Sequence, residues 1–479
     1  MTARTATIRG MAAALMVLPA LGCTLQGYRP EPIEPARVAE ALGSRRSDDT
    51  GLRSFMERHN YAVSEWPLTQ WDLEALTLMA VYFNPEMDVA RANLAVQRAA
   101  EITAGQRPNP RANPLLEHHS AASHGAVDTP WSVGLGLDFP IETGGKREAR
   151  IARAQSLNDE ARLSLGETAW KVRSRLRQRF VDAFAADETA KLAQQELDLR
   201  KQEVDLLERR QKAGEVSPSE VTLARLRLQE TRLAADSADG NIRAARAALA
   251  AALDLPFEET EKLQLSFGKL TESPFPALPE PEVQHAALQN RLDLRQGLDR
   301  YAASEATLRE EIARQYPDID LSPGFLWDQG DWIKSLGGAI LLPLFNNNEG
   351  PIGEAEANRK LEAARFKSLE SDVLAQSSAA GLRYETALKT WDTAKSIVVT
   401  QKARLEDTKK LINFGESDRL TLVETEIELL AARRAELQTR IDGLQAWGGV
   451  EDAVQKPLDG TVLAPDDMTA SPATQGTRP

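Results

Sequence analysis

Two long stretches without proline, residues 146–214 and 352–415, dominate this 479-residue sequence. At 1.5 Å per residue each would form a helix of roughly 100 Å, several times longer than an ordinary globular helix. The same series of features surrounds both stretches, and corresponding positions are separated by a nearly constant interval: Pro110 and Pro317, Pro140 and Pro343, Gly214 and Gly415. This interval is too long for a solenoid repeat. It predicts one pseudo-symmetric domain built from two copies.

The repeat defines the predicted organisation of the chain. We expect an export signal (1–22), an N-terminal connector (23–70), a first repeat (71–254), a linker (255–280), a second repeat (281–450) and a disordered tail (451–479). Shorter helical patterns flank each long one: 71–107, 219–253, 281–315 and 418–447. Two of these shorter helices laid end to end match one long helix. The lengths therefore predict a rod or tube with coiled-coil packing.

The N-terminus has the features of a bacterial lipoprotein signal. Arg4 and Arg9 precede an apolar run, and Leu21-Gly22 precede Cys23, the one cysteine of the chain. Ala20 stands where the usual lipobox prefers leucine. We expect Cys23 to be acylated after cleavage, and the alternative is a free thiol. Without a second cysteine, no disulfide within the chain is possible.

Charge and hydropathy restrict the class of protein. The net charge of −13 becomes −15 once Arg4 and Arg9 are removed with the signal, and such acidity argues against nucleic acid as a partner. After the signal, no apolar stretch is long enough for a transmembrane helix. The sequence offers no Cys/His pair with zinc spacing, no phosphate-binding glycine loop and no nucleophile elbow. We therefore expect neither an enzyme nor a cofactor.

Four segments alternate between apolar and small or polar residues, as membrane-spanning strands do. They are 112–122, 131–139, 318–327 and 334–345, with aromatic residues near their ends: Trp131, Phe139, Trp327, Trp332 and Phe345. Two ordinary hairpins on a soluble core are the alternative, but isolated hairpins are marginal in water. Because the smallest membrane barrels have eight strands, the chain must combine its strands with those of other copies. Two copies would give eight strands and three would give twelve.

The turns after the two long helices are alike. Gly214 and Gly415 can adopt the left-handed conformation that ends a helix. Ser217 and Asp418 follow at the same spacing and can cap the returning helix. One such turn is a weak signal, but its occurrence at matching places in both repeats supports a pair of equivalent helical tips.

With these features the sequence resembles the TolC-type outer-membrane efflux proteins over nearly all of residues 23–450. The segments RPNP (107–110), ETGGKR (142–147) and LPLFNNNEG (342–350) resemble the CzcC-like, heavy-metal branch of that family. The resemblance implies an α+β membrane protein with an internal two-fold repeat. Three copies would form a twelve-stranded outer-membrane barrel, continued by a helical barrel through the periplasm.

The resemblance also implies partners and gate residues. The tips would dock onto a periplasmic adaptor that connects the tunnel to an inner-membrane pump of the RND type. Glu424 stands at an acidic position of the tunnel gate and Glu220 at a position that helps hold it closed, whereas Thr421 replaces an aspartate that relatives often have. The chain would be lipid-anchored in the outer membrane and extend into the periplasm, as a homotrimer in contact with membrane lipid.

The exported substrate is the least constrained prediction. Acidic residues lining a tunnel would favour cations, so we expect a passive conduit for heavy-metal cations. His118, His119 and His124 near the first strand pair could bind such metals, or belong to an ordinary polar loop. The alternatives are export of drugs or organic solutes, type I protein secretion, and a structural coiled-coil lipoprotein that transports nothing.

Overall fold

The computed structural model describes residues 27–120, 129–272, 275–276 and 278–458. It divides into two compact units, Met1–Ser44 and Arg45–Pro479. The described part of the first unit contains α2 (Pro35–Gly43), which has no buried residue. The second unit contains both repeats.

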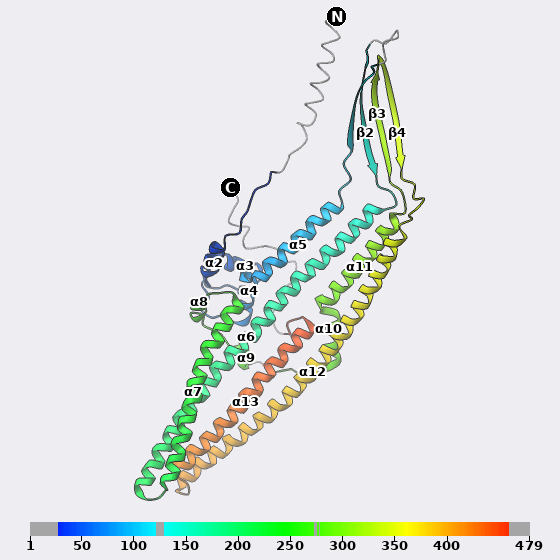
Figure 1. Ribbon diagram of the computed structural model, residues 1–479. Coiled ribbons are helices and arrows are strands. Elements are labelled where there is room, and N and C mark those ends of the chain that lie inside the picture. The colour runs from blue at the N-terminus through cyan, green and yellow to red at the C-terminus, as the bar shows by residue number, and fades with distance from the viewer. Residues whose placement is uncertain (1–26, 121–128, 273–274, 277, 459–479) are drawn as a thin grey trace. The chain divides into compact units, whose positions relative to one another are not determined.

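Two very long helices organise the second unit, as the sequence predicts. These are α6 (Lys146–Ala213), with 68 residues, and α12 (Glu349–Phe414), with 66. They run side by side with the shorter helices, the strands extend from one end, and the turns after α6 and α12 lie at the other end (Figure 1). The remaining helices are α3 (Thr50–Arg58), α4 (Leu73–Phe83), α5 (Pro85–Ala104), α7 (Pro218–Leu253), α8 (Phe257–Glu261), α9 (Gly268–Glu272), α10 (Glu280–Asn290), α11 (Leu292–Ala313) and α13 (Arg419–Val454).

The helix that precedes the strands is interrupted in each repeat, which corrects the predicted continuous helices 71–107 and 281–315. In the first repeat the chain is extended at Asn84, whose side chain accepts a hydrogen bond from the Glu86 amide, and Pro85 begins the next helix. Proline lacks the N–H that a continuous helix would need there. In the second repeat the extended residue is Arg291, which pairs with Asp293 at 2.6 Å.

The segments predicted as a connector and a tail contain more helix than expected. Helices α2 and α3 lie within 23–70, and α3 buries Leu52, Phe55 and Met56 completely or almost completely. At the other end α13 continues to Val454, beyond the predicted boundary at 450. Leu52, Phe55 and Met56 of α3 recur at helical spacing, which is the pattern of a helix with one buried face.

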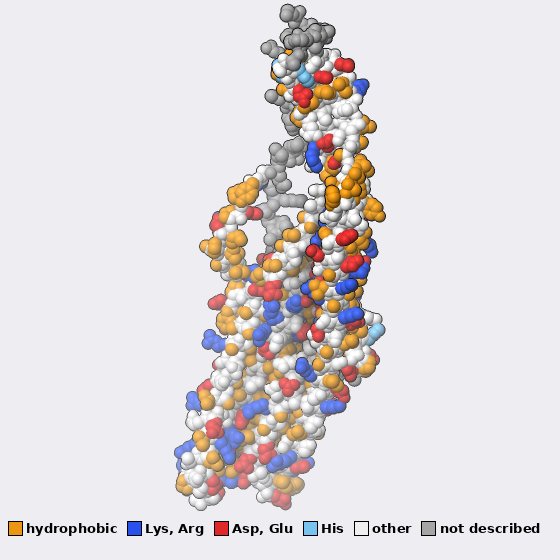
Figure 2. Space-filling model, turned by 45° about the vertical axis from the view of Figure 1, so that its right-hand side comes forward, with side chains coloured by type: hydrophobic (Ala, Val, Ile, Leu, Met, Phe, Trp, Pro, Cys, Tyr) orange, Lys and Arg blue, Asp and Glu red, His pale blue; other side chains and the backbone are white. Residues whose placement is uncertain are grey.

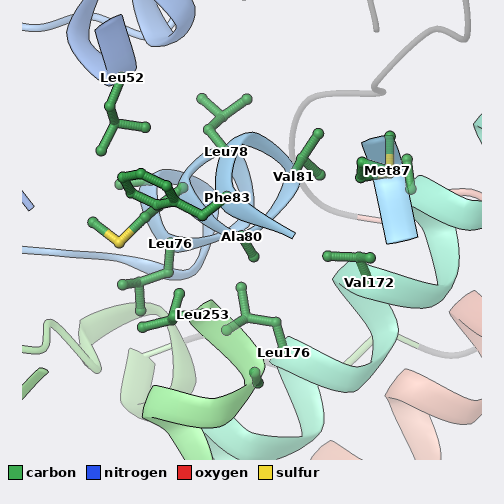
Figure 3. Close-up of a cluster of buried hydrophobic side chains, with 14 of the residues drawn as sticks. Leu52, Leu76, Leu78, Ala80, Val81, Phe83, Met87, Val172, Leu176 and Leu253 are labelled. Atoms are coloured by element: carbon green, nitrogen blue, oxygen red, sulfur yellow. The ribbon is translucent and has the colours of Figure 1, made fainter. Parts of the chain in front are cut away.

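The first hydrophobic core joins α3, α4, α6 and α7 (Figure 3). Leu76 and Met79 of α4, Leu176 of α6 and Leu253 of α7 have no exposed surface. Because α4 is apolar on nearly all sides, it is buried on nearly all sides. Each fully buried leucine stabilises the fold by roughly 1.5–3 kcal/mol. A second core contains side chains of α10, α11, α12 and α13 and surrounds Tyr384 of α12. The Tyr384 hydroxyl donates to the Pro276 carbonyl at 2.8 Å.

A buried ion-pair network joins the first repeat to the second. Glu451 of α13, with 1% of its side chain exposed, accepts hydrogen bonds from Arg173 (2.9 Å) and Arg177 (2.7 Å) of α6. Arg177 also donates to Asp452 at 2.6 Å and to the Gly448 carbonyl at 2.9 Å. Burial alone would raise the pKa of Glu451, but the two guanidinium groups outweigh it and hold that pKa below its ordinary value.

The strands form one antiparallel sheet in the order β1-β2-β3-β4, so the hairpins of the two repeats are joined edge to edge. The strands are β1 (Arg111–His118), β2 (Trp131–Ile141), β3 (Ile319–Asp328) and β4 (Asp331–Ile340). β4 lies earlier than the predicted 334–345, because the chain leaves the sheet before Pro343. A tight turn with positive φ at Gln329 and Gly330 joins β3 to β4.

The register gives the sheet two different faces. The apolar face consists of Ala112, Pro114, Leu116, His118, Trp131, Val133, Leu135, Leu137, Phe139, Ile141, Ile319, Leu321, Pro323, Phe325, Trp327, Trp332, Lys334, Leu336, Gly338 and Ile340. The intervening residues form the polar face, which is rich in glycine, serine and carboxylates. Hydrophobic side chains gather on the strands, whereas charged ones spread over the helices (Figure 2). All residues of β1 and β4 are exposed, so the alternative of hairpins packed on a soluble core is excluded.

No helix within the described ranges combines the length and apolarity that would be needed to cross a bilayer.

Candidate functional site

The two helical tips have the conformations that the sequence predicts. α6 ends at Gly214 (φ 80°) and α12 ends at Gly415 (φ 75°), both in the left-handed region. At the first tip the Ser217 hydroxyl accepts from the Glu220 amide and caps α7. Glu220 completes a capping box, because its carboxylate accepts from the Ser217 backbone amide at 3.3 Å. At the second tip the Asp418 carboxylate accepts from the Thr421 amide at 2.9 Å. Both turns are thus fixed by local hydrogen bonds.

An ion pair that sequence reasoning missed links the two tips. Arg210, in the last turn of α6, lies 2.6 Å from the second oxygen of Asp418. Asp418 therefore caps its own helix and holds the neighbouring hairpin. Arg210 and the Thr421 amide lower the pKa of Asp418, and Asp418 raises the pKa of Arg210. Leu411 stands at the place of Arg210 in the second repeat, so the link has no symmetric counterpart, and no pattern in the sequence indicates it.

Glu424 lies near this link but takes no part in it. The residue is exposed, and among the described residues no lysine or arginine forms an ion pair with it, since Arg434 pairs with Glu196 instead. Although the residue is exposed, the surrounding protein withdraws enough water from its carboxyl to raise the pKa of Glu424. The carboxylates of Glu203, Asp418 and Glu428 raise this pKa further, and Arg210 opposes them.

The positions of Glu220 and Thr421 differ from that of Glu424. Glu220 is engaged in the capping box of α7, and the Thr421 hydroxyl lies 3.3 Å from the Asp418 carboxylate. Both residues therefore shape the tips directly, as local partners of the two capping residues. Two of the three predicted gate residues are glutamates. The Glu220 carboxylate accepts hydrogen bonds from Ser217, whereas among the described residues no residue of the tips donates to the Glu424 carboxylate.

The polar face of the sheet concentrates negative charge. Its acids outnumber its one basic residue, Arg111, and they are Glu117, Asp138, Asp320, Asp328 and Asp331. Glu117 and Asp328 each lie 3.9 Å from the His119 ring, and Asp138 accepts from the Asn113 amide. A passage lined by this face would attract cations.

The predicted histidine cluster is not formed by its described members. His118 packs against the Trp131 ring at 4.6 Å on the apolar face, whereas His119 lies 3.0 Å from the Ser132 hydroxyl on the polar face. Successive residues of an extended chain point to opposite sides, so these two cannot bind one metal. His124 and Cys23 lie outside the described residues. Within the part of the chain that the structure describes, no group of three His, Cys, Asp or Glu side chains could hold a metal ion.

Comparison with known proteins supports the same architecture. The family model "Outer membrane efflux protein" matches residues 79–254 and 283–454, one match in each repeat. The outer membrane protein VceC from Vibrio cholerae has a similar structure, with a TM-score of 0.64 at 18% identity over 81% of this chain and 97% of VceC.

The names of two relatives refer to different substrates. The cobalt-zinc-cadmium resistance protein CzcC of Cupriavidus metallidurans is 28% identical over 60% of this chain, and the match spans 66% of CzcC, just under two thirds. The pyoverdine export outer membrane protein OpmQ of Pseudomonas aeruginosa is 22% identical over 89% of this chain and 93% of OpmQ.

Proposed function

This chain belongs to the outer membrane efflux protein family, and on that premise we propose that it exports heavy-metal cations as the outer-membrane part of a three-component system. It is a channel and not an enzyme, and it extends from the outer membrane into the periplasm. Transport through it is passive, and the energy comes from a pump in the inner membrane.

The free edges of the sheet support assembly into a trimer. β1 and β4 each have one unpaired edge, and every unpaired backbone group in lipid costs several kcal/mol. Joining β4 of one copy to β1 of the next removes these edges, and three copies form a closed twelve-stranded barrel. The apolar face then contacts lipid, and the polar face lines the passage.

The carboxylates of the polar face are the observation that favours cations as the cargo. Three copies place fifteen carboxylates and three arginines along one passage, since each copy supplies five acids and one Arg111. The similarity to CzcC agrees with this charge. The similarity to OpmQ, which spans nearly the whole chain, supports export of an organic solute as the second candidate.

Ion selectivity and metal tolerance together test this function. We expect the purified protein to conduct in planar bilayers with a reversal potential shifted toward that of the cation, more strongly at low salt. Deleting the gene should lower tolerance of zinc, cobalt or cadmium without affecting export of organic solutes. An anion-selective channel, or normal metal tolerance of the deletion strain, would contradict the proposal.

The two tips are the proposed docking surface for a periplasmic adaptor, which connects the tunnel to an inner-membrane RND pump. Gly214 and Gly415 end their helices in open space, where a β-carbon added to either residue would meet no atom within 4 Å. The turns are therefore accessible to a partner. The link between Arg210 and Asp418 holds the two tips in a fixed relation for that partner to bind.

Glu424→Gln is expected to weaken cation selectivity and block by divalent ions, because Glu424 of three copies would form an acidic ring in the lower tunnel. Since the pKa of Glu424 is raised, block should be full above that pKa and disappear as the pH falls through it. Single-channel recording across a pH series measures both effects. Glu370→Gln, at another exposed glutamate, is the control. If divalent ions block Glu424→Gln as strongly as wild type, Glu424 is an ordinary surface charge and not part of an acidic ring.

Acylation of Cys23 is proposed to anchor the mature chain in the periplasmic leaflet of the outer membrane. Mass spectrometry of the purified protein should find a lipid-modified Cys23 at the N-terminus and no residue of 1–22. Because the strands themselves hold the protein in the membrane, Cys23→Ala should impair sorting more than conductance. An unmodified thiol or an intact signal would refute the anchor.

A further inference from the structure

Lys334 is the one lysine or arginine, and the one residue with a permanent charge, on the apolar face of the described strands. It is exposed, and the residue opposite it on β3 is Phe325. Among the described residues no carboxylate lies within ion-pairing distance of its ammonium group. A charge placed against lipid destabilises a membrane strand unless something in its surroundings compensates it.

The surroundings of Lys334 place it near the membrane surface. Trp332 precedes it by two residues on the same face and pairs across the sheet with Trp327. These tryptophans stand beside the β3–β4 turn, where an interfacial aromatic belt is expected. Lys334 lies two residues farther from the turn than Trp332. Its aliphatic stem can extend along the sheet and bring its ammonium group to the level of the tryptophans.

The described part of β1 in a neighbouring copy offers this charge no partner. In the closed barrel β4 would border β1 of the next copy, and the apolar face of β1 offers Ala112, Pro114, Leu116 and His118. None of these is an acid. Since the described residues supply no counter-charge, the lipid around the sheet is the source that the inference takes.

We infer that Lys334, beside Trp332 and Trp327, binds a phosphate group of the phosphorylated glycolipid in the outer leaflet of the outer membrane. The leaflet follows from the fold: the helices leave the sheet at the end opposite the β3–β4 turn (Figure 1), so in a channel that extends into the periplasm this turn faces outward. The inference rests on the proposed function only in requiring that the apolar face contacts the outer membrane.

The test compares lipid retention by the full-length assembled protein. Four proteins are compared: wild type, Lys334→Met, Lys334→Arg and the control Lys402→Met, which changes an exposed lysine of α12. Each is incubated in mild detergent with bis-phosphorylated lipid A, dephosphorylated lipid A or phosphatidylglycerol. Native mass spectrometry counts the lipids bound per assembly. Lys334→Met should retain about fivefold less bis-phosphorylated lipid A, whereas Lys334→Arg and Lys402→Met should match wild type.

Several outcomes would overturn this site. Equal retention by Lys334→Met and wild type would exclude it, and equal retention of dephosphorylated lipid A would exclude phosphate recognition. Equal retention of phosphatidylglycerol would exclude the outer leaflet as the source. Conductance of the same preparations separates the two proposals: a channel that conducts cations without a Lys334 effect refutes the lipid site alone. Selective lipid A binding by a protein that conducts no cations would refute the transport function alone.

Discussion

Glu451→Ala is expected to destabilise the folded chain by about 3–5 kcal/mol, because it removes the buried carboxylate that two buried guanidinium groups share. Arg173 and Arg177 are both at most one-tenth exposed and cannot turn to water without disturbing α6. The Leu458 amide also donates to Glu451 at 3.0 Å, so the end of the described chain should loosen as well. Thermal unfolding in detergent, followed by the circular dichroism of the helices, measures the loss.

Two controls separate this effect from a simple change of charge. Glu370→Ala removes an exposed glutamate and should change stability by no more than about 0.5 kcal/mol. Replacing Arg173, Arg177 and Glu451 together with methionine should be far less damaging than Glu451→Ala, because no buried charge then remains. If Glu451→Ala unfolds at the wild-type temperature, the network contributes nothing to holding the repeats together.

The double variant Gly214→Val, Gly415→Val is expected to abolish export while the protein still assembles. Valine disfavours the left-handed conformation that both glycines adopt, at about 1–2 kcal/mol per residue. Space is not the obstacle, since a β-carbon added at either position would meet no atom within 4 Å beyond the adjoining residues. The tips should therefore change shape while the cores and the sheet, at a distance from them, stay intact. Metal tolerance of cells reports export, and light scattering of the purified protein reports assembly.

The matched control replaces both glycines with asparagine, which tolerates the left-handed region. Gly214→Asn, Gly415→Asn should retain most of the export. Full metal tolerance in the double valine variant would argue strongly against docking through the tips. Loss of assembly in that variant would show that the tips stabilise the oligomer.

The main elements of this fold could be predicted from sequence because each has a strong periodic signal. The alternation over residues 131–139 locates β2 almost to its ends, and the absence of proline locates α6. The helix interruption at Asn84-Pro85 also has a sequence signal, a capping asparagine before proline. The interruption at Arg291 has none, because tertiary partners on α12, such as Gln376, hold that residue extended.

The candidate site was predictable only where it depends on local structure. The glycine turns and the caps at Ser217 and Asp418 follow from residue type, since each bond closes within a few residues. The link from Arg210 to Asp418 joins positions that are distant in the chain, and no local pattern reports it. The same applies to the polar face, whose acids become one group only through the register between β2 and β3.

The pairing of β2 with β3 has a consequence for the order of folding. Val133 lies opposite Trp327, and the whole hairpin of α6 and α7 separates them in the chain. Closing so long a loop is entropically unfavourable until the intervening segment is compact. Helical hairpins form from local contacts and need no such closure. The helices must therefore collapse first and act as the template that brings β2 to β3, so the membrane-facing sheet should be the last part of each chain to form.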